Sequence, residues 1–146
     1  MQLTLHTDYA LRVLIYLSLY PDKVVTIDEV TDYYNISRNH LVKVVHNLST
    51  HDFIQTTRGK NGGMRLGRPA TEINVADVVE KMEHHFDIVE CFNTEKPKCT
   101  VVPICALRGV LYTARTAFMD TLKGYTLADA VEPYARPPIA QNNSTN

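Results

Sequence analysis

Residues 37–67 read SRNHLVKVVHNLSTHDFIQTTRGKNGGMRLG. Four apolar residues in the first half of this stretch recur at helical spacing: Leu41, Val44, Val45 and Leu48. They predict an amphipathic helix with one buried face, and Ser37 stands where an N-cap residue is expected. Two strand-like runs follow at residues 53–58 and 64–68, separated by the glycine-rich residues 59–63. The stretch therefore predicts a helix followed directly by a β-hairpin.

Two further helices are expected before this stretch. Thr26 and Glu29 have the spacing of a capping box, which predicts a short helix that stops at Asn35. An earlier helix ends near Tyr20, because Pro21 disfavours a helical residue before it. Its apolar positions are Ala10, Val13, Leu14 and Leu17. Two short helices joined by a tight turn are typical of a helix-turn-helix, and a hairpin behind them is typical of a wing. We therefore expect a mainly α fold with a small β-hairpin wing.

The charges are unevenly placed along the chain, whose net charge is −1. Residues 36–69 carry six Lys and Arg side chains against one acid, Asp52, for a local balance of +5. Residues 71–146 carry seven basic and ten acidic side chains. A basic stretch beside an acidic one is the charge pattern of a domain that contacts phosphates with one face. A simple solvated surface would give the same counts.

The start of the second helix of the pair and the wing supply the expected contacts to double-stranded DNA. We expect Arg38 and Asn39 to contact bases, and the basic residues of the later helix and wing to contact phosphates or groove walls. The candidate set is Arg38, Asn39, His40, Lys43, Arg58, Lys60, Asn61 and Arg65. Glycine-rich loops also bind nucleotides, but residues 59–63 lack the G-K-[ST] of a P-loop and no helix directly follows them.

A long helix is the main feature of the second half. Asn74 can cap a helix that ends around His84, and residues 86–103 then form an irregular loop. Beyond the loop, residues recur at steps of three and four: Leu107, Val110, Leu111, Ala114, Ala117, Phe118, Thr121 and Leu122. A helix of this length after a small winged domain favours a homodimer. The alternative is a helix folded back onto its own core.

Length and composition fit one domain with a modest extension. At 146 residues and 45% hydrophobic, the chain can bury a core without disulfides. We expect a winged helix-turn-helix domain over residues 1–72, a cysteine loop and dimerisation helix over 73–131, and a disordered tail over 132–146. The longest apolar stretch carries Arg12 and is too short to span a bilayer, and we expect no signal peptide, because the first residues lack the charged start and cleavage site of one. We expect a cytoplasmic protein with reduced thiols and no membrane partner.

Three cysteines, Cys91, Cys99 and Cys105, lie in the loop and at the start of the long helix. Their spacing is looser than the C-x-x-C pairs of zinc sites, but it suits an iron–sulfur cluster held by a flexible loop. A zinc-binding or thiol-redox repressor would use the same residues, whereas inert, buried cysteines fit a polar, proline-containing loop poorly. No histidine and acid stand at a recognisable catalytic motif, so we do not expect an enzyme.

Four motifs together resemble a known family. They are the helix start Ser37-Arg38-Asn39-His40, the wing Arg58-Gly59-Lys60-Asn61-Gly62-Gly63 with Arg65-Leu66-Gly67, the three cysteines, and Tyr125-Thr126-Leu127-Ala128-Asp129. With these motifs, residues 1–131 resemble the NsrR family of nitric-oxide-sensing bacterial repressors, which is related to the cluster regulator IscR. The resemblance implies a winged-helix homodimer, crossed through the long helix, that binds a DNA operator.

The resemblance also implies a sensing mechanism. It implies that Cys91, Cys99 and Cys105 bind a [4Fe-4S] or [2Fe-2S] cluster, and that nitric oxide destroys the cluster and releases DNA. The derepressed genes would detoxify nitric oxide. The family's position for a fourth ligand, supplied by the other subunit, falls on Asp8. The same residue has the i,i+4 spacing to Arg12 of an ordinary surface ion pair.

Histidine ligation is not favoured by the sequence. Where IscR-like relatives place a histidine ligand after the third cysteine, this chain has Leu107. Three other histidines have no clear metal-ligand spacing to the cysteines and are interpreted as solvated: His6, His84 and His85.

Overall fold

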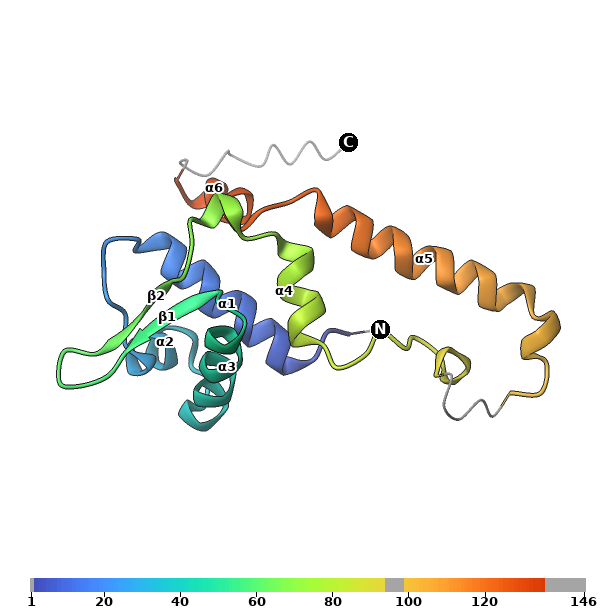
Figure 1. Ribbon diagram of the computed structural model, residues 1–146, viewed down its shortest axis with the longest axis horizontal. Coiled ribbons are helices and arrows are strands. Elements are labelled where there is room, and N and C mark those ends of the chain that lie inside the picture. Colours follow the sequence, from blue (N-terminus) through green and yellow to red (C-terminus); the bar gives the residue numbers. More distant parts are fainter. Residues whose placement is uncertain (1, 94–98, 136–146) are drawn as a thin grey trace, which may run out of the picture.

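The computed structural model describes residues 2–93 and 99–135. Most of the helices and the hairpin form one packed body, and α5 extends away from it (Figure 1). The elements in chain order are α1 (Leu5–Leu19), α2 (Ile27–Tyr34), α3 (Arg38–Thr50), β1 (Ile54–Thr57), β2 (Gly63–Leu66), η1 (Ala70–Glu72), α4 (Val75–Met82), η2 (Glu90–Phe92), η3 (Val102–Ile104), α5 (Ala106–Lys123) and α6 (Leu127–Ala135). The mainly α fold with a hairpin is as expected from the sequence.

Helix α1 is the centre of the body, and it contacts α3, α4, α6 and β2. The four apolar residues predicted to face inward are at most 1% exposed: Ala10, Val13, Leu14 and Leu17. The hydroxyl of Thr4 caps the helix by accepting a hydrogen bond from the amide of Thr7 at 3.3 Å. The helix ends at Leu19, immediately before Tyr20 and Pro21, which confirms the predicted end.

Helices α2 and α3 form the predicted helix-turn-helix. The capping box of Thr26 and Glu29 is present, and Asn35 adopts the left-handed conformation (φ 52°) that makes the turn tight. The predicted stripe of α3 is buried: Leu41, Val44, Val45 and Leu48. Ser37 is the N-cap residue by position, but its side chain makes no capping hydrogen bond. Its carbonyl oxygen accepts the first hydrogen bond of the helix, from the amide of Leu41 at 3.2 Å.

The wing is an antiparallel hairpin in which Ile54 pairs with Leu66 and Thr57 with Gly63. Met64, which pairs with Thr56, is buried and exchanges two backbone hydrogen bonds with Val25, at 2.9 and 2.7 Å. This bridge ties the wing to the segment before α2. Gly63 leaves room for that contact, because a Cβ atom there would lie 2.6 Å from the carbonyl oxygen of Val25.

The hydrophobic core continues through the second half of the chain. Ile73, Val78 and Met82 join the cluster built around α1, so the core crosses residues 72 and 73, where the sequence analysis places a boundary. The side chain of Asn74 caps α4 as expected, by accepting the amide of Ala76 at 2.9 Å. The helix ends at Met82, slightly before the predicted end.

Helix α6 corrects the prediction for the C-terminal part of the chain. The sequence predicts a disordered tail from residue 132 onward, but α6 continues to Ala135. Thr126 and Asp129 cap its start reciprocally: the hydroxyl of Thr126 accepts the amide of Asp129 at 3.3 Å, and the carboxylate of Asp129 accepts the amide of Thr126 at 2.7 Å. The hydrogen bonds that its carboxylate accepts from the backbone amide and the hydroxyl of Thr126 hold the pKa of Asp129 below its ordinary value. Leu127 is 2% exposed in the core. Residues 136–146 of the predicted tail lie outside the described residues.

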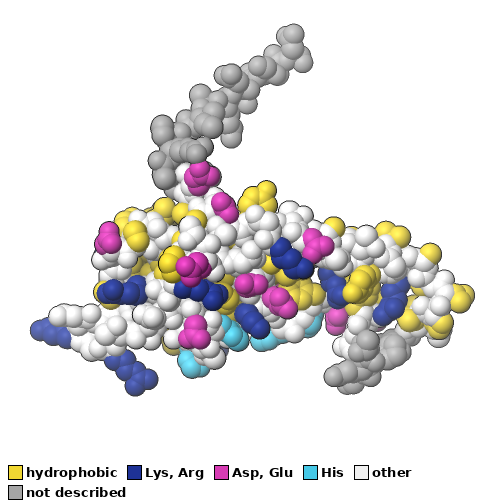
Figure 2. All heavy atoms as spheres, turned by 45° about the horizontal axis from the view of Figure 1, so that its top comes forward, with side chains coloured by type: hydrophobic (Ala, Val, Ile, Leu, Met, Phe, Trp, Pro, Cys, Tyr) yellow, Lys and Arg dark blue, Asp and Glu magenta, His cyan; other side chains and the backbone are white. Residues whose placement is uncertain are grey.

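Helix α5 differs from the other long helices because none of its residues is buried. It contacts α4, and its far end extends beyond the body (Figure 1). Leu107 and Val110 are each 62% exposed, and Figure 2 shows hydrophobic side chains at the surface of this end of the molecule. Within the described residues, no helix is long and apolar enough to cross a membrane.

We expect Leu127→Ala to lower the free energy of unfolding by about 2–4 kcal/mol, because it leaves a cavity where α6 packs on the core. Urea unfolding followed by circular dichroism measures the loss. Val42→Ala serves as the control, since Val42 is 42% exposed and its truncation should change stability by less than about 0.5 kcal/mol. Equal effects of the two substitutions would show that α6 is not part of the folded core.

Candidate DNA-binding surface and cysteine segment

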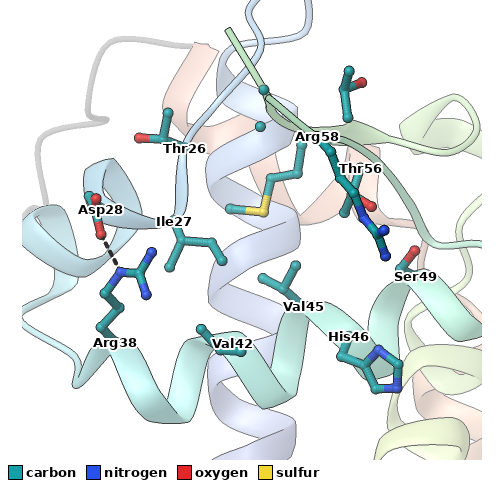
Figure 3. Close-up of a pocket in the computed structure, with 14 residues that line it drawn as sticks. Thr26, Ile27, Asp28, Arg38, Val42, Val45, His46, Ser49, Thr56 and Arg58 are labelled. Carbon is teal, nitrogen blue, oxygen red and sulfur yellow. Dashed lines mark hydrogen bonds and ion pairs between the residues drawn. The ribbon is translucent and has the colours of Figure 1, made fainter. Parts of the chain in front are cut away.

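A groove of about 500 Å³ lies between the start of α2, one face of α3 and the wing. One wall of the groove is formed by residues of α3 that lie about one turn apart: Arg38, Val42, His46 and Ser49. Thr56, Thr57 and Arg58 contribute the opposite wall from the wing. In Figure 3, Arg38 rises from the start of α3 and Arg58 points from the wing toward Ser49. Two cations from separate elements therefore face one groove.

All eight predicted DNA-contacting residues are exposed, but they do not share one wall. Arg38 and Arg58 line the groove. The ring of His40 lies 6.2 Å from that of Tyr9, at the junction of α1 and α3. Arg65 pairs with Gln55 and so lies on the opposite face of the hairpin from Met64, which lines the groove. The remaining four are Asn39 and Lys43 on α3, and Lys60 and Asn61 in the loop of the wing.

The candidate set from the sequence omits residues that line the groove. Val42 and His46 follow Arg38 at successive intervals of four residues, and this i,i+4 spacing is the signal that places them on the same face. Asp28, at the start of α2, is also part of the groove wall. Its carboxylate accepts a hydrogen bond from Nε of Arg38 at 2.8 Å. A pairing between residues ten positions apart depends on the angle between α2 and α3, so the sequence gives no direct sign of it.

The N-terminal segment is fixed to both α3 and the end of α4. The amide of Asn47 donates to Nε2 of His6 at 3.1 Å, and the backbone amide of Thr4 donates to the carboxylate of Glu83 at 2.7 Å. Burial lowers the pKa of His6, nearby His84 lowers it further, and Glu83 opposes the shift. The lowered pKa favours the neutral ring, which can accept the hydrogen bond from Asn47. The N-terminal residues thereby connect the end of α4 to α3.

The cysteine segment, residues 86–105, is described up to Asn93 and from Cys99 onward, and its η2 turn is held against α5. Cys91 lies in η2, and its carbonyl oxygen accepts a hydrogen bond from Nε of Arg108 at 3.3 Å. The guanidinium of Arg115 lies 5.0 Å from the ring centre of Phe92 and 4.8 Å from that of Tyr112, so η2 is also held by cation–π contacts. All three cysteines are free thiols: Cys91 and Cys105 are half-buried, Cys99 is exposed, and Cys105 is the N-cap residue of α5.

Comparison with known proteins establishes the family of this chain. Residues 3–133 match the family model Rrf2, described as "Iron-dependent Transcriptional regulator". The chain belongs to the Rrf2 family. It is 48% identical over 130 residues to the HTH-type transcriptional regulator NsrR of Halalkalibacterium halodurans, covering 88% of this chain and 89% of that protein. It is 44% identical over 133 residues to NsrR of Bacillus subtilis, covering 90% and 91%. These identities confirm the resemblance on which the sequence analysis relies.

Solved structures confirm the winged-helix fold expected for this Rrf2 member. The structure of CymR, the global cysteine regulator of B. subtilis, superposes with a TM-score of 0.72 at 23% identity, covering 89% of this chain and 95% of CymR. The IscR structure from T. potens superposes with a TM-score of 0.75 at 17% identity, covering 95% and 93%. The relatives identified by sequence are named as transcriptional regulators, which agrees with the predicted class of function.

The iron dependence in the family description raises the question of which residues of this Rrf2 member suit a metal. Free thiols are the ligands that iron–sulfur clusters use, so the chemistry of the three cysteines fits. Among the described residues, however, no three His, Cys, Asp or Glu side chains come together to hold a metal ion. Asp8 forms the ion pair with Arg12 at 2.8 Å, with both side chains about 40% exposed.

Proposed function

We propose that this transcriptional regulator is a homodimeric repressor that senses nitric oxide through an iron–sulfur cluster and controls nitric oxide detoxification genes. The observation that carries the proposal is the position of the cysteine segment. Cys105 is the N-cap residue of α5, and the carbonyl of Cys91 accepts a hydrogen bond from Arg108 in the first turn of this helix, whose exposed face suits a second subunit. The relatives at 44–48% identity carry the name NsrR, which supports the same signal.

In this proposal, α3 enters the major groove of the operator and the wing lies along the adjacent backbone. The exposed polar residues at the start of α3, Arg38 and Asn39, contact base edges. Phosphates or groove walls are contacted by the other cations: Lys43, Arg58, Lys60 and Arg65. Because Arg65 lies on the far face of the hairpin, it contacts a different part of the backbone from Arg58. The part of the operator that faces the protein groove between α3 and the wing thus meets Arg38 on one side and Arg58 on the other.

The second subunit packs on the exposed stripe of α5. Five of its residues are exposed and alternate at steps of three and four: Leu107, Val110, Ala114, Ala117 and Thr121. This is the heptad spacing of a helix seam, and its small residues let two helices approach closely. Arg115 and Phe118 are partly buried and line a cavity with the N-terminal residues and the segment after α4. One face of α5 therefore serves its own body and the other serves the partner.

The proposed cluster is bound by Cys91, Cys99 and Cys105, with Asp8 of the second subunit as the fourth ligand. When bound, its iron atoms supply the chemistry that reacts with nitric oxide. The chain's own residues transmit the result. Asp8 lies in the first turn of α1, and α1 packs directly on α3, so a constraint on Asp8 fixes the angle of the recognition helix. In a dimer, that angle sets whether two recognition helices fit half-sites about 34–36 Å apart.

A thiol-redox or zinc-responsive repressor of the same fold is the second candidate. One observation favours it: Cys99 is an exposed free thiol, accessible to an oxidant. DNA binding and dimerisation would be the same in this candidate, and only the chemistry at the three cysteines would differ. Metal content distinguishes the two.

For the wing, we expect Lys60→Ala to weaken binding to all DNA sequences similarly, because it removes a phosphate contact rather than a base contact. The slope of log affinity against log salt should fall in magnitude by about one unit. Fluorescence anisotropy at several salt concentrations measures it. Lys81→Ala, in the last turn of α4, is the matched control and should leave both quantities unchanged. An unaltered slope for Lys60→Ala would refute the assignment of the wing.

For the cysteine segment, we expect anaerobically purified protein to contain iron and sulfide and to absorb broadly in the visible range. Stoichiometric nitric oxide should bleach this absorption. Each of the substitutions Cys91→Ser, Cys99→Ser and Cys105→Ser should reduce the iron content to less than about half, because each removes a cluster thiolate. His85→Ala is the control and should retain iron. Colourless protein that cannot be reconstituted with iron and sulfide would exclude the cluster and leave the zinc or thiol-redox candidate.

For α5, we expect Val110→Glu to weaken dimerisation at least tenfold, because association would bury a carboxylate from each subunit. Analytical ultracentrifugation measures the dissociation constant. Thr116→Glu introduces the same charge on the exposed face of α5 opposite the seam and should leave the dimer intact. A monomeric wild-type chain, or equal weakening by both substitutions, would place the interface elsewhere.

A further inference from the structure

An acidic residue stands in the groove where DNA is proposed to bind. Asp28 lies in the first turn of α2, and with Arg38 it lines the groove between α2, α3 and the wing (Figure 3). An exposed carboxylate at a DNA-facing position repels phosphates, so it weakens binding to DNA of any sequence. The side chain of Asp28 is 69% exposed and that of Arg38 is 61% exposed. An ion pair as exposed as this contributes little to folding stability.

The geometry of the pair gives Asp28 a role other than stability. Its carboxylate accepts the hydrogen bond from Nε of Arg38 at 2.8 Å. Among the described residues, the guanidinium of Arg38 forms no other hydrogen bond or ion pair. The planar group is therefore fixed through one nitrogen, and the two terminal nitrogens are left to donate. Two parallel donors in one plane are what the O6 and N7 acceptors of a guanine require in the major groove.

We propose that Asp28 is a positioning residue that orients Arg38 for a bidentate contact with guanine and thereby sets sequence specificity at one base pair of each half-site. This proposal rests on the DNA binding proposed above. Without Asp28, Arg38 is a long side chain with several rotatable bonds, and it can reach a phosphate as readily as a base. Asp28 thus lowers affinity for DNA of any sequence, because it repels the phosphates, and raises selectivity for one base, because it restrains Arg38.

Removal of Asp28 should lower the preference for guanine and raise the affinity for DNA of unrelated sequence. A change of charge alone would raise the affinity without changing the preference. Asp28→Ala should lower the preference for guanine at the position read by Arg38 by about tenfold, which is the discrimination expected of one bidentate contact. The same substitution should raise affinity for DNA of unrelated sequence, because a negative charge is removed from the groove. Asp28→Glu should retain most of the preference, because it keeps a carboxylate within reach of Nε.

Asp32→Ala is the matched control. Asp32 is exposed on the same face of α2, one turn further from the start of the helix, and forms no ion pair among the residues the structure describes. Removing it changes the charge equally without releasing Arg38. We expect Asp32→Ala to leave the base preference unchanged. Thermal unfolding of each variant verifies that the helix-turn-helix remains folded.

The experiment uses the full-length chain, purified anaerobically, and a library of duplexes with about 25 randomised base pairs, enough to span two half-sites one helical turn apart. Selection with the wild-type chain gives an enriched sequence, and selection with Arg38→Ala identifies the position that Arg38 reads. Binding of each variant to the enriched duplex, to its single-base variants at that position and to a shuffled duplex is then measured by anisotropy. In the Arg38→Ala background, Asp28→Ala should have no further effect on base preference.

The outcomes are distinct. Loss of the guanine preference in Asp28→Ala but not in Asp32→Ala or Asp28→Glu supports the positioning role. The proposal is overturned if Asp28→Ala keeps the wild-type preference, or if Arg38→Ala relaxes no position, while the wild-type chain still enriches a sequence. If the wild-type chain enriches no sequence at all, specific DNA binding itself fails, and the positioning role fails with it.

Discussion

The structure depends on the burial of α1 on several sides at once. Its inward residues, such as Leu14 and Leu17, contact a core shared by the recognition helix, the wing, α4 and α6. Each of these elements is short and would bury too little apolar surface to fold alone. Packing around one central helix gives them a common core, so their relative positions are coupled through α1. The recognition helix is therefore not an independent module, and whatever displaces α1 also changes the groove between α3 and the wing.

Most of the DNA-binding half could be predicted from the sequence because its signals are local. The capping box of Thr26 and Glu29, the end of α2 at Asn35 and the stripe along α3 each depend on residues a few positions apart. The wing likewise follows from a glycine-rich turn between two strand-like runs. The contacts that polar side chains make between different elements could not be predicted in the same way. The pairing of Arg38 with Asp28 and the position of Arg65 on the far side of the hairpin both depend on the angles between elements.

The second half was harder to predict for two physical reasons. Helix α6 was missed because its composition is proline-containing and its stability depends on docking Leu127 into a core contributed mostly by the first half. Its capping pair, Thr126 and Asp129, was the available signal. Helix α5 was predicted correctly as an element, but a single chain leaves its apolar stripe unpaired. The proposed cluster site is hard to predict for the same reason. Its proposed fourth ligand comes from the other subunit, and no local sequence pattern gives the distance between that ligand and the cysteines.

In the proposed sensor, the cluster ligands lie at the two ends of a series of contacts made by the N-terminal residues. The proposed ligand Asp8 lies in the first turn of α1, close in sequence to His6, which contacts α3 through Asn47. Thr4 contacts Glu83 at the end of α4, from which the chain continues to the first cysteine. The segment before Asp8 is thus attached both to the helix that would read DNA and to the segment that would bind the cluster. The free Asp8 has a ready alternative partner in Arg12, one turn along the same helix. Breaking this ion pair costs little stability, because both side chains are about 40% exposed, so Asp8 is available to a partner from a second subunit.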